Sequence, residues 1–245
     1  MSKWFTQISW DEAPHLSKHD KDDLYASIPP YQREARSKGI PQLGSGAIYP
    51  IAEDQITVAD FPIPDHWRRV WGLDTGWNWT AVVWIAVNLE DGTHYVYSCY
   101  KRGTEPPSVH ADAIKSRGLW IPGVADAADI NKIDGRQMVA LYRDDFGLDV
   151  VLPIKAVEAG LYNAWTLFTQ GKLKIFKSLT PWFDEYRFYQ RDAQGKVVKG
   201  NDHLMDATRY ALMSMDRARA VPAPPQPERE VYIDISAVGL GWLNG

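Results

Sequence analysis

The chain has 245 residues, of which 45% are hydrophobic and 24% charged, enough for one large domain with extensions and a buried core. A single cysteine, Cys99, excludes an internal disulfide and a cysteine-rich zinc site, and fits a reducing cytoplasm. The formal net charge of −4 argues mildly against a nucleic-acid partner, although a basic face can be local. No run of about 18 apolar residues and no apolar N-terminal stretch occurs, so we expect neither a membrane span nor a signal peptide.

The first region, residues 1–65, is expected to be an extension that does not fold alone. A polar stretch at 17–27 predicts a helix with Ser17 as its cap, ended by two prolines. A second short helix is expected at 31–38, and a loop punctuated by glycine and proline follows at 40–50.

Three apolar strands joined by short turns come next. They are expected at 69–74, 80–87 and 93–100. Short turns between strands predict an antiparallel meander. The segment 106–115 then predicts a helix.

Beyond this helix, strands and helices alternate. We expect strands at 120–126, 149–154 and 173–176, and helices at 134–146 and 158–169. A meander followed by alternating strands and helices predicts an α/β fold: a mixed sheet with helices on both faces. That order is typical of the ribonuclease H-like (integrase/resolvase-type) fold.

The end of the chain divides into three parts. An aromatic stretch at 182–189 leads into an expected hairpin at 190–198, and a last helix is expected at 201–217. The last part, residues 221–245, starts with a proline-rich stretch, which is typical of a linker or a disordered tail. The domain would therefore span residues 66–220.

Two acids stand at the ends of predicted strands. Asp74 and Asp126 each close an apolar strand, where an acid serves either in a site or as a turn former or helix cap. Asp129, three residues after Asp126, is a competing candidate.

A second pair of acids belongs to the last predicted helix. Asp202 and Asp206 are four residues apart and fall on one helix face, where like charges repel unless a cation lies nearby. Alternatively, Asp202 is an N-cap and Asp206 a surface residue. His203 is expected to be a neighbour of the site and not a ligand.

Together these acids have the arrangement that two-metal phosphodiester hydrolysis needs. Several carboxylates must converge on ions about 4 Å apart. Oxygen ligands suit Mg²⁺ or Mn²⁺, so we expect two such ions as cofactors.

Three segments, taken together, resemble the nuclease domain of tailed-phage terminase large subunits: 69–83, 123–126 and 201–210. In addition, 40–50 resembles the stretch that joins the ATPase of this family to its nuclease. The resemblance covers residues 10–215. It departs in the third segment, where His203 replaces an acid of the commoner family form.

The resemblance implies an endonuclease that cuts concatemeric double-stranded DNA in the host cytoplasm during genome packaging. Its catalytic metal ligands would be Asp74, Asp126 and Asp202, with Asp206 close by as a further ligand or as a group that positions water. The small terminase subunit and the portal of the procapsid would be partners of the full-length protein. No G-x-x-x-x-G-K-[ST] loop occurs, so we expect a nuclease domain without its ATPase, which cannot translocate DNA.

Basic residues near the last helix are candidates for phosphate contacts. Four belong to the expected hairpin and its flanks, namely Arg187, Arg191, Lys196 and Lys199, and two precede the first strand, Arg68 and Arg69. The alternative is a solvated strand face. Nothing predicts a reader of base edges, so we expect low sequence specificity.

Three other functions fit part of the sequence. The stretch 73–80 also resembles the first phosphate loop of actin-like ATPases and sugar kinases, which need a second lobe that 245 residues hardly allow. A resolvase or recombinase would share the fold and the chemistry. A docking module with a degenerate metal site is the non-catalytic alternative.

Overall fold

The computed structural model describes residues 9–12, 16–27, 37, 46–76, 78–126, 138–192 and 195–223. Several predicted features lie outside these residues: the helix at 31–38 apart from residue 37, the start of the helix at 134–146, Asp129, and the chain beyond 223. In the described part, no helix is both long and apolar enough to span a bilayer.

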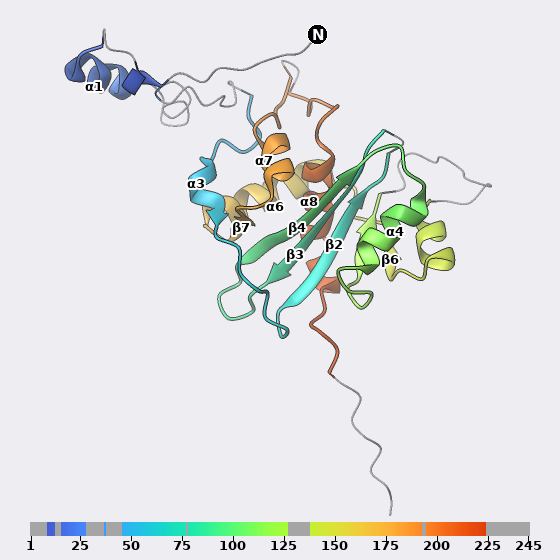
Figure 1. The fold of residues 1–245 in the computed structure, drawn as a ribbon. Helices are drawn as coiled ribbons and strands as arrows, with labels where there is room; N and C mark the ends of the chain where they lie inside the picture. The colour runs from blue at the N-terminus through green and yellow to red at the C-terminus, as the bar shows by residue number, and fades with distance from the viewer. Residues whose placement is uncertain are drawn as a thin grey trace, which may run out of the picture.

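A seven-stranded mixed sheet forms the centre of the molecule (Figure 1). Its strands are β1 (Thr57–Val58), β2 (Arg68–Asp74), β3 (Thr80–Val87), β4 (His94–Arg102), β5 (Gly123–Ala125), β6 (Val150–Val151) and β7 (Leu173–Phe176). They lie in the order β1-β7-β4-β3-β2-β5-β6. The antiparallel pairs β2–β3 and β3–β4 are the predicted meander, and all other pairs are parallel. The predicted α/β fold class is therefore confirmed.

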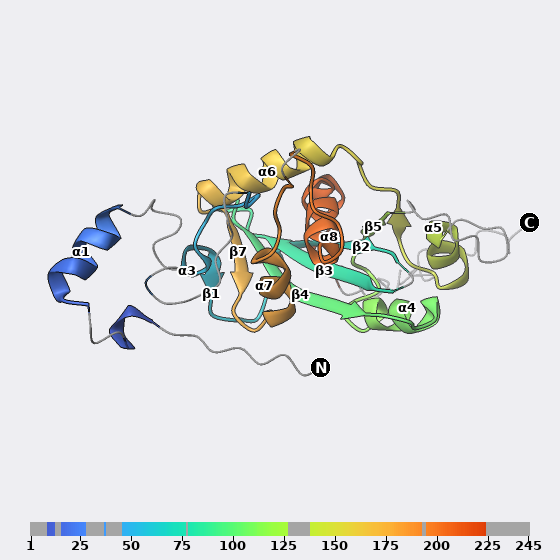
Figure 2. The same ribbon diagram turned by 90° about the horizontal axis from the view of Figure 1, so that it is seen from above.

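Helices cover both faces of the sheet (Figure 2). One face packs against α6 (Val157–Thr169), α7 (Thr180–Tyr186) and α8 (His203–Leu212). The other packs against α4 (Pro107–Lys115), α5 (Met138–Ala140) and the π-helical turn η3 (Leu141–Asp145). This double cover explains why every residue of β3 is buried and why its sequence is a continuous apolar run.

The remaining helices are short or lie near the ends of the described chain. They are η1 (Trp10–Glu12), α1 (Lys18–Ser27), α3 (Glu53–Ile56) and η4 (Met215–Arg217). At the start of α1, the Asp20 amide donates to the Ser17 hydroxyl over 3.2 Å, so the predicted cap is confirmed.

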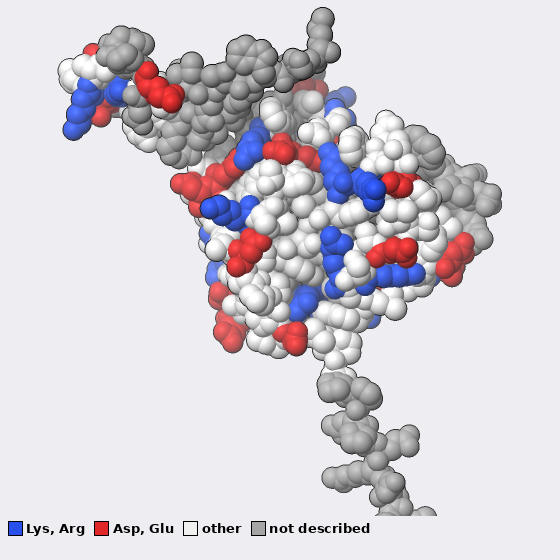
Figure 3. Space-filling view, in the orientation of Figure 1, with Lys and Arg blue, Asp and Glu red and all other residues white. Residues whose placement is uncertain are grey.

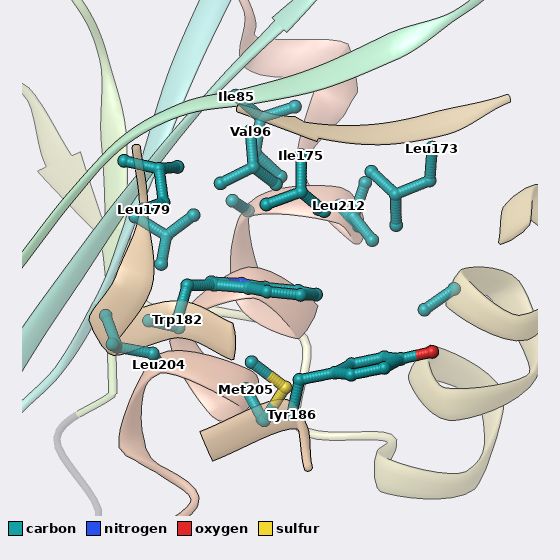
Figure 4. Packing of buried hydrophobic residues seen from close by; sticks show 14 of the residues in the cluster. Ile85, Val96, Leu173, Ile175, Leu179, Trp182, Tyr186, Leu204, Met205 and Leu212 are labelled. Atoms are coloured by element: carbon teal, nitrogen blue, oxygen red, sulfur yellow. The ribbon is translucent and has the colours of Figure 1, made fainter. Parts of the chain in front are cut away.

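Aromatic rings dominate the core under α7 and α8 (Figure 4). The Trp182 ring stacks on Tyr186 with centroids 5.2 Å apart and lies below the sheet residues Ile85 and Ile175. Its indole N–H donates to the Thr208 hydroxyl on α8 over 2.9 Å. These contacts fix α8 against α7 and the sheet.

Packing does not break at the predicted boundary between residues 65 and 66. Residues of β1 pair in parallel with β7, and Tyr49 and Ile56 are 5% and 1% exposed. The Tyr186 hydroxyl donates to the carbonyl oxygen of Ile51 over 2.9 Å. Residues 46–65 thus cover an edge of the sheet that would otherwise be unpaired.

Three predicted elements are clearly shorter than expected. The strand at 120–126 is reduced to Gly123–Ala125. The strand at 149–154 is reduced to Val150–Val151, and Pro153, which has no N–H to donate, lies in the segment leading to α6. The last helix begins at His203 and ends at Leu212, followed by the turn η4.

Helix α8 approaches β2 most closely at Gly72. A Cβ atom at this position would overlap the carbonyl oxygen of Ala207 and lie 2.8 Å from the amide nitrogen of Ala211. Both are backbone atoms that cannot rotate away. Only glycine permits this contact, which sets the distance between α8 and the strand that ends at Asp74.

We expect Gly72→Ala to lower the free energy of unfolding by about 1–3 kcal/mol or more, because α8 must shift away from the sheet. Urea denaturation followed by tryptophan fluorescence measures the change. As a control, Asp112→Ala on the exposed side of α4 should stay within about 0.5 kcal/mol of the wild type. A glycine variant as stable as this control would contradict the close packing.

Candidate metal centre

Sheet topology brings the first two acids together. Asp74 is the last residue of β2, and Asp126 directly follows β5, the parallel neighbour of β2. The Asp126 amide donates to the carbonyl oxygen of Leu73 over 3.0 Å. Because parallel strands end at the same edge of a sheet, both carboxylates lie at one edge, as the sequence predicted.

The start of α8 lies at this edge. Asp202 precedes the first residue of the helix, and Asp206 lies in its first turn. As whole residues, Asp202 and Asp206 are 5% and 7% exposed, so the alternative in which Asp206 is a surface residue is wrong. Asp202 occupies the N-cap position, but its side chain makes no capping hydrogen bond.

All four acids line one cleft of about 410 Å³. The other lining residues are Thr75, Gly76, Lys155, Val157, Lys199, Gly200, His203, Arg209 and Tyr210. Polar side chains with exchangeable protons therefore surround the carboxylates.

The acids at the strand ends have three close partners. His203 Nδ1 lies 2.8 Å from Asp74 Oδ2. Lys155 Nζ lies 2.8 Å from Asp126 Oδ1, and the Tyr210 hydroxyl donates to Asp126 Oδ2 over 2.8 Å. His203 thus contacts a candidate ligand directly, which places it next to the site as expected.

The acids of α8 share a lysine. Lys199 Nζ lies 2.8 Å from Asp202 Oδ2 and 2.9 Å from Asp206 Oδ2. The buried Arg209 guanidinium donates to Asp206 Oδ1 over 3.0 Å. A single ammonium therefore bridges two carboxylates that would otherwise repel each other.

Burial and hydrogen bonding act in opposite directions on Asp74. Burial raises the pKa of its carboxyl group, and the hydrogen bond from His203 partly offsets this effect. The same hydrogen bond raises the pKa of His203. A carboxylate held in this way gains stability from any further positive charge in the cleft.

The donor set fits a hard divalent cation. All four acids offer oxygen ligands, and two buried oxygens, Asp126 Oδ1 and Asp202 Oδ2, accept no hydrogen bond of good geometry despite the lysines nearby. Within the described residues, however, no three acid, imidazole or thiol groups stand ready as a metal-binding group.

A buried residue that sequence reasoning missed supports the start of α8. Glu185 on α7 is 1% exposed and accepts the backbone N–H of Leu204 over 2.6 Å. Lys101 Nζ lies 2.6 Å from its other carboxylate oxygen. Glu185 thereby satisfies a free amide of the helix that holds Asp202 and Asp206. No local sequence pattern distinguishes Glu185 from its neighbour Asp184, which is an exposed acid.

Three of the four basic residues proposed for DNA contacts are engaged elsewhere. Arg187 lies outside the cleft lining and binds both carboxylate oxygens of Glu53, at 2.7 and 2.8 Å. Arg191 binds Glu158 on α6 in the same bidentate manner. Lys199 lies in the acid cluster itself.

Of the other basic candidates, Lys196 is exposed on the turn between 190 and 198. Arg68 and Arg69 lie at the opposite end of β2 from Asp74. On the face that Figure 3 shows, basic side chains alternate with acidic ones. The described surface seen there forms no continuous basic stripe.

Comparison with known proteins agrees with this geometry. Residues 71–215, more than half of the chain, match the family described as "Terminase RNaseH-like domain". The terminase large subunit of Salmonella phage P22 is 35% identical and aligns over 89% of this chain and 48% of its own length. This chain thus spans about half the length of the curated relatives it matches.

Solved structures agree on the fold. The nuclease domain of the P22 large terminase superposes with a TM-score of 0.67 at 29% identity, covering 73% of this chain and 96% of that domain. The large terminase nuclease of thermophilic phage G20c, solved with bound magnesium, gives a TM-score of 0.52 at 18% identity, covering 69% and 98%.

These matches confirm the predicted ribonuclease H-like fold and decide against the actin-like alternative. The predicted resemblance to terminases is equally confirmed. The chain belongs to the terminase large-subunit family and contains its ribonuclease H-like nuclease domain.

Proposed function

We propose that this domain is a divalent-metal-dependent endonuclease that cuts concatemeric double-stranded DNA during viral genome packaging. One observation supports it above all: four carboxylates from β2, from the end of β5 and from the start of α8 line a single cleft. The bound magnesium in the G20c nuclease supports a metal of the same class.

Asp74, Asp126 and Asp202 are the proposed metal ligands, and Asp206 is a further ligand. Two Mg²⁺ or Mn²⁺ ions, when bound, supply Lewis acidity for the attack of water and stabilise charge on the leaving oxygen. The protein's part is to hold the acids in place. Tyr210 orients Asp126, His203 orients Asp74, and both do so through hydrogen bonds of 2.8 Å.

Double-stranded DNA is the proposed substrate, bound through phosphates with low sequence specificity. Lys196 is an exposed basic residue of the turn that precedes α8, so we retain it as a phosphate contact. For the full-length protein we propose the small terminase subunit and the portal as partners, in the cytoplasm of the host. We also propose the division into residues 1–65, 66–220 and 221–245, with residues 46–65 of the extension packed on the nuclease domain.

We expect Asp74→Asn to abolish cleavage, since it removes a charge at the centre of the cluster without changing side-chain size. Nicking of supercoiled plasmid with Mn²⁺, Mg²⁺ or EDTA measures this, with the wild type cutting only when metal is present. Asp112→Asn, an exposed acid on α4, is the matched control and should cut normally. Metal-dependent nicking by Asp74→Asn at the wild-type rate would rule out the proposed centre.

Divalent ions should raise the thermal unfolding temperature. An ion that binds only the folded state adds about 2.7 kcal/mol to the free energy of unfolding at 100 times its dissociation constant. Differential scanning fluorimetry with millimolar MnCl₂ and with EDTA measures the shift, which Asp74→Asn should reduce. A wild-type protein that melts at one temperature under both conditions would speak against metal binding.

Glu185→Ala should lower the free energy of unfolding by about 3–5 kcal/mol, because it leaves the Lys101 ammonium and the Leu204 amide without their buried partner. Urea denaturation is again the measurement. Asp184→Ala removes the exposed neighbouring acid and should cost no more than about 1 kcal/mol. Equal costs for the two variants would show that Glu185 does not support α8.

A further inference from the structure

Two lysines reach the acids from the solvent side. The Lys199 side chain is 69% exposed, yet its ammonium contacts Asp202 and Asp206, whose side chains are only 7% and 9% exposed. Lys155, 55% exposed, contacts the 10% exposed Asp126 in the same way. In both cases a largely exposed side chain holds its charged end against buried acids.

The charges of the cluster nearly cancel. Four carboxylates contribute −4, and Lys155, Lys199 and Arg209, which contact three of them, contribute +3. His203 adjoins the fourth acid, Asp74. Positive charge from the protein itself therefore lets the acids lie close together.

The lysines occupy the oxygens that a metal would use. A Mg²⁺ ion binds oxygen at about 2.0–2.1 Å. The Lys155 nitrogen already lies 2.8 Å from Asp126 Oδ1, and the Lys199 nitrogen lies 2.8 Å from Asp202 Oδ2. The two cations cannot share these positions.

We propose that Lys199, together with Lys155, is an internal counter-ion that competes with divalent metal for the acid cluster. It holds Asp202 and Asp206 together in the metal-free protein and must leave them before metal binds. The metal concentration at which the site fills is thus set by the lysines. This inference rests on the proposed metal centre and adds a residue-level control of its occupancy.

The third basic residue of the cluster has a different role. Arg209 is 3% exposed and holds Asp206 from inside the protein, so it stays in place when metal binds. Each lysine stem, by contrast, is flexible and largely exposed, so its ammonium can swing into water without a change in the fold. Lys199 and Lys155 can therefore be displaced while Arg209 stays in place.

The decisive measurement is the affinity for Mn²⁺ in the absence of DNA, by isothermal titration calorimetry. Because the competing ammonium is gone, Lys199→Gln should bind Mn²⁺ roughly 3- to 10-fold more tightly than the wild type, through the loss of the two contacts of this largely exposed lysine. Lys177→Gln is the matched control: it removes an exposed lysine that does not line the cleft and should leave the affinity unchanged.

Stability gives a second readout that a change in overall charge would not produce. In EDTA, Lys199→Gln should melt below the wild type, because Asp202 and Asp206 then repel each other. In saturating Mn²⁺ the difference should vanish or reverse. Lys177→Gln should follow the wild type under both conditions.

The outcomes separate this inference from the proposed function. A wild type that binds no Mn²⁺ at millimolar concentration refutes the metal centre itself. A wild type that binds Mn²⁺, with Lys199→Gln binding equally or more weakly, overturns the competition and leaves the metal centre intact. If Lys199→Gln does not fold, Lys155→Gln takes its place: tighter binding supports the proposal, and unchanged binding overturns it.

Discussion

The contact between α8 and β2 is the constraint on which the site depends. At Gly72 the helix backbone touches the strand backbone, and no side chain fits between them. Because of this contact, the start of α8 reaches the sheet edge where Asp74 and Asp126 stand. The Trp182 indole and Glu185 then fix the same helix from α7. A small shift of one helix would separate two of the acids from the other two.

Repulsion between the acids is the cost of this arrangement. Buried carboxylates raise one another's pKa unless positive charge offsets them, and burial does raise the pKa of Asp74. Two kinds of positive charge offset this repulsion: the buried Arg209, which is a permanent partner, and the lysines, which reach the acids from the solvent side and are exchangeable. In the proposed function, the permanent partner shapes the site and the exchangeable ones give way to the metal.

The sequence predicted what depends on local pattern and failed where distant residues meet. Short turns and apolar runs indicated the meander, and strand-end acids indicated the cleft, because parallel strands end at one edge. Nothing local could show that Arg187 would pair with Glu53, 134 residues away. The role of Glu185 and the packing of residues 46–65 equally depend on tertiary contacts.

A crystal structure obtained with Mn²⁺, with anomalous diffraction measured to locate the ions, tests the metal centre most directly. We predict anomalous peaks bounded by the carboxylates of Asp74, Asp126, Asp202 and Asp206, with the Lys199 ammonium withdrawn from the two acids of α8. A Mn²⁺-grown crystal without such peaks, with Lys199 still bridging Asp202 and Asp206, would contradict the account.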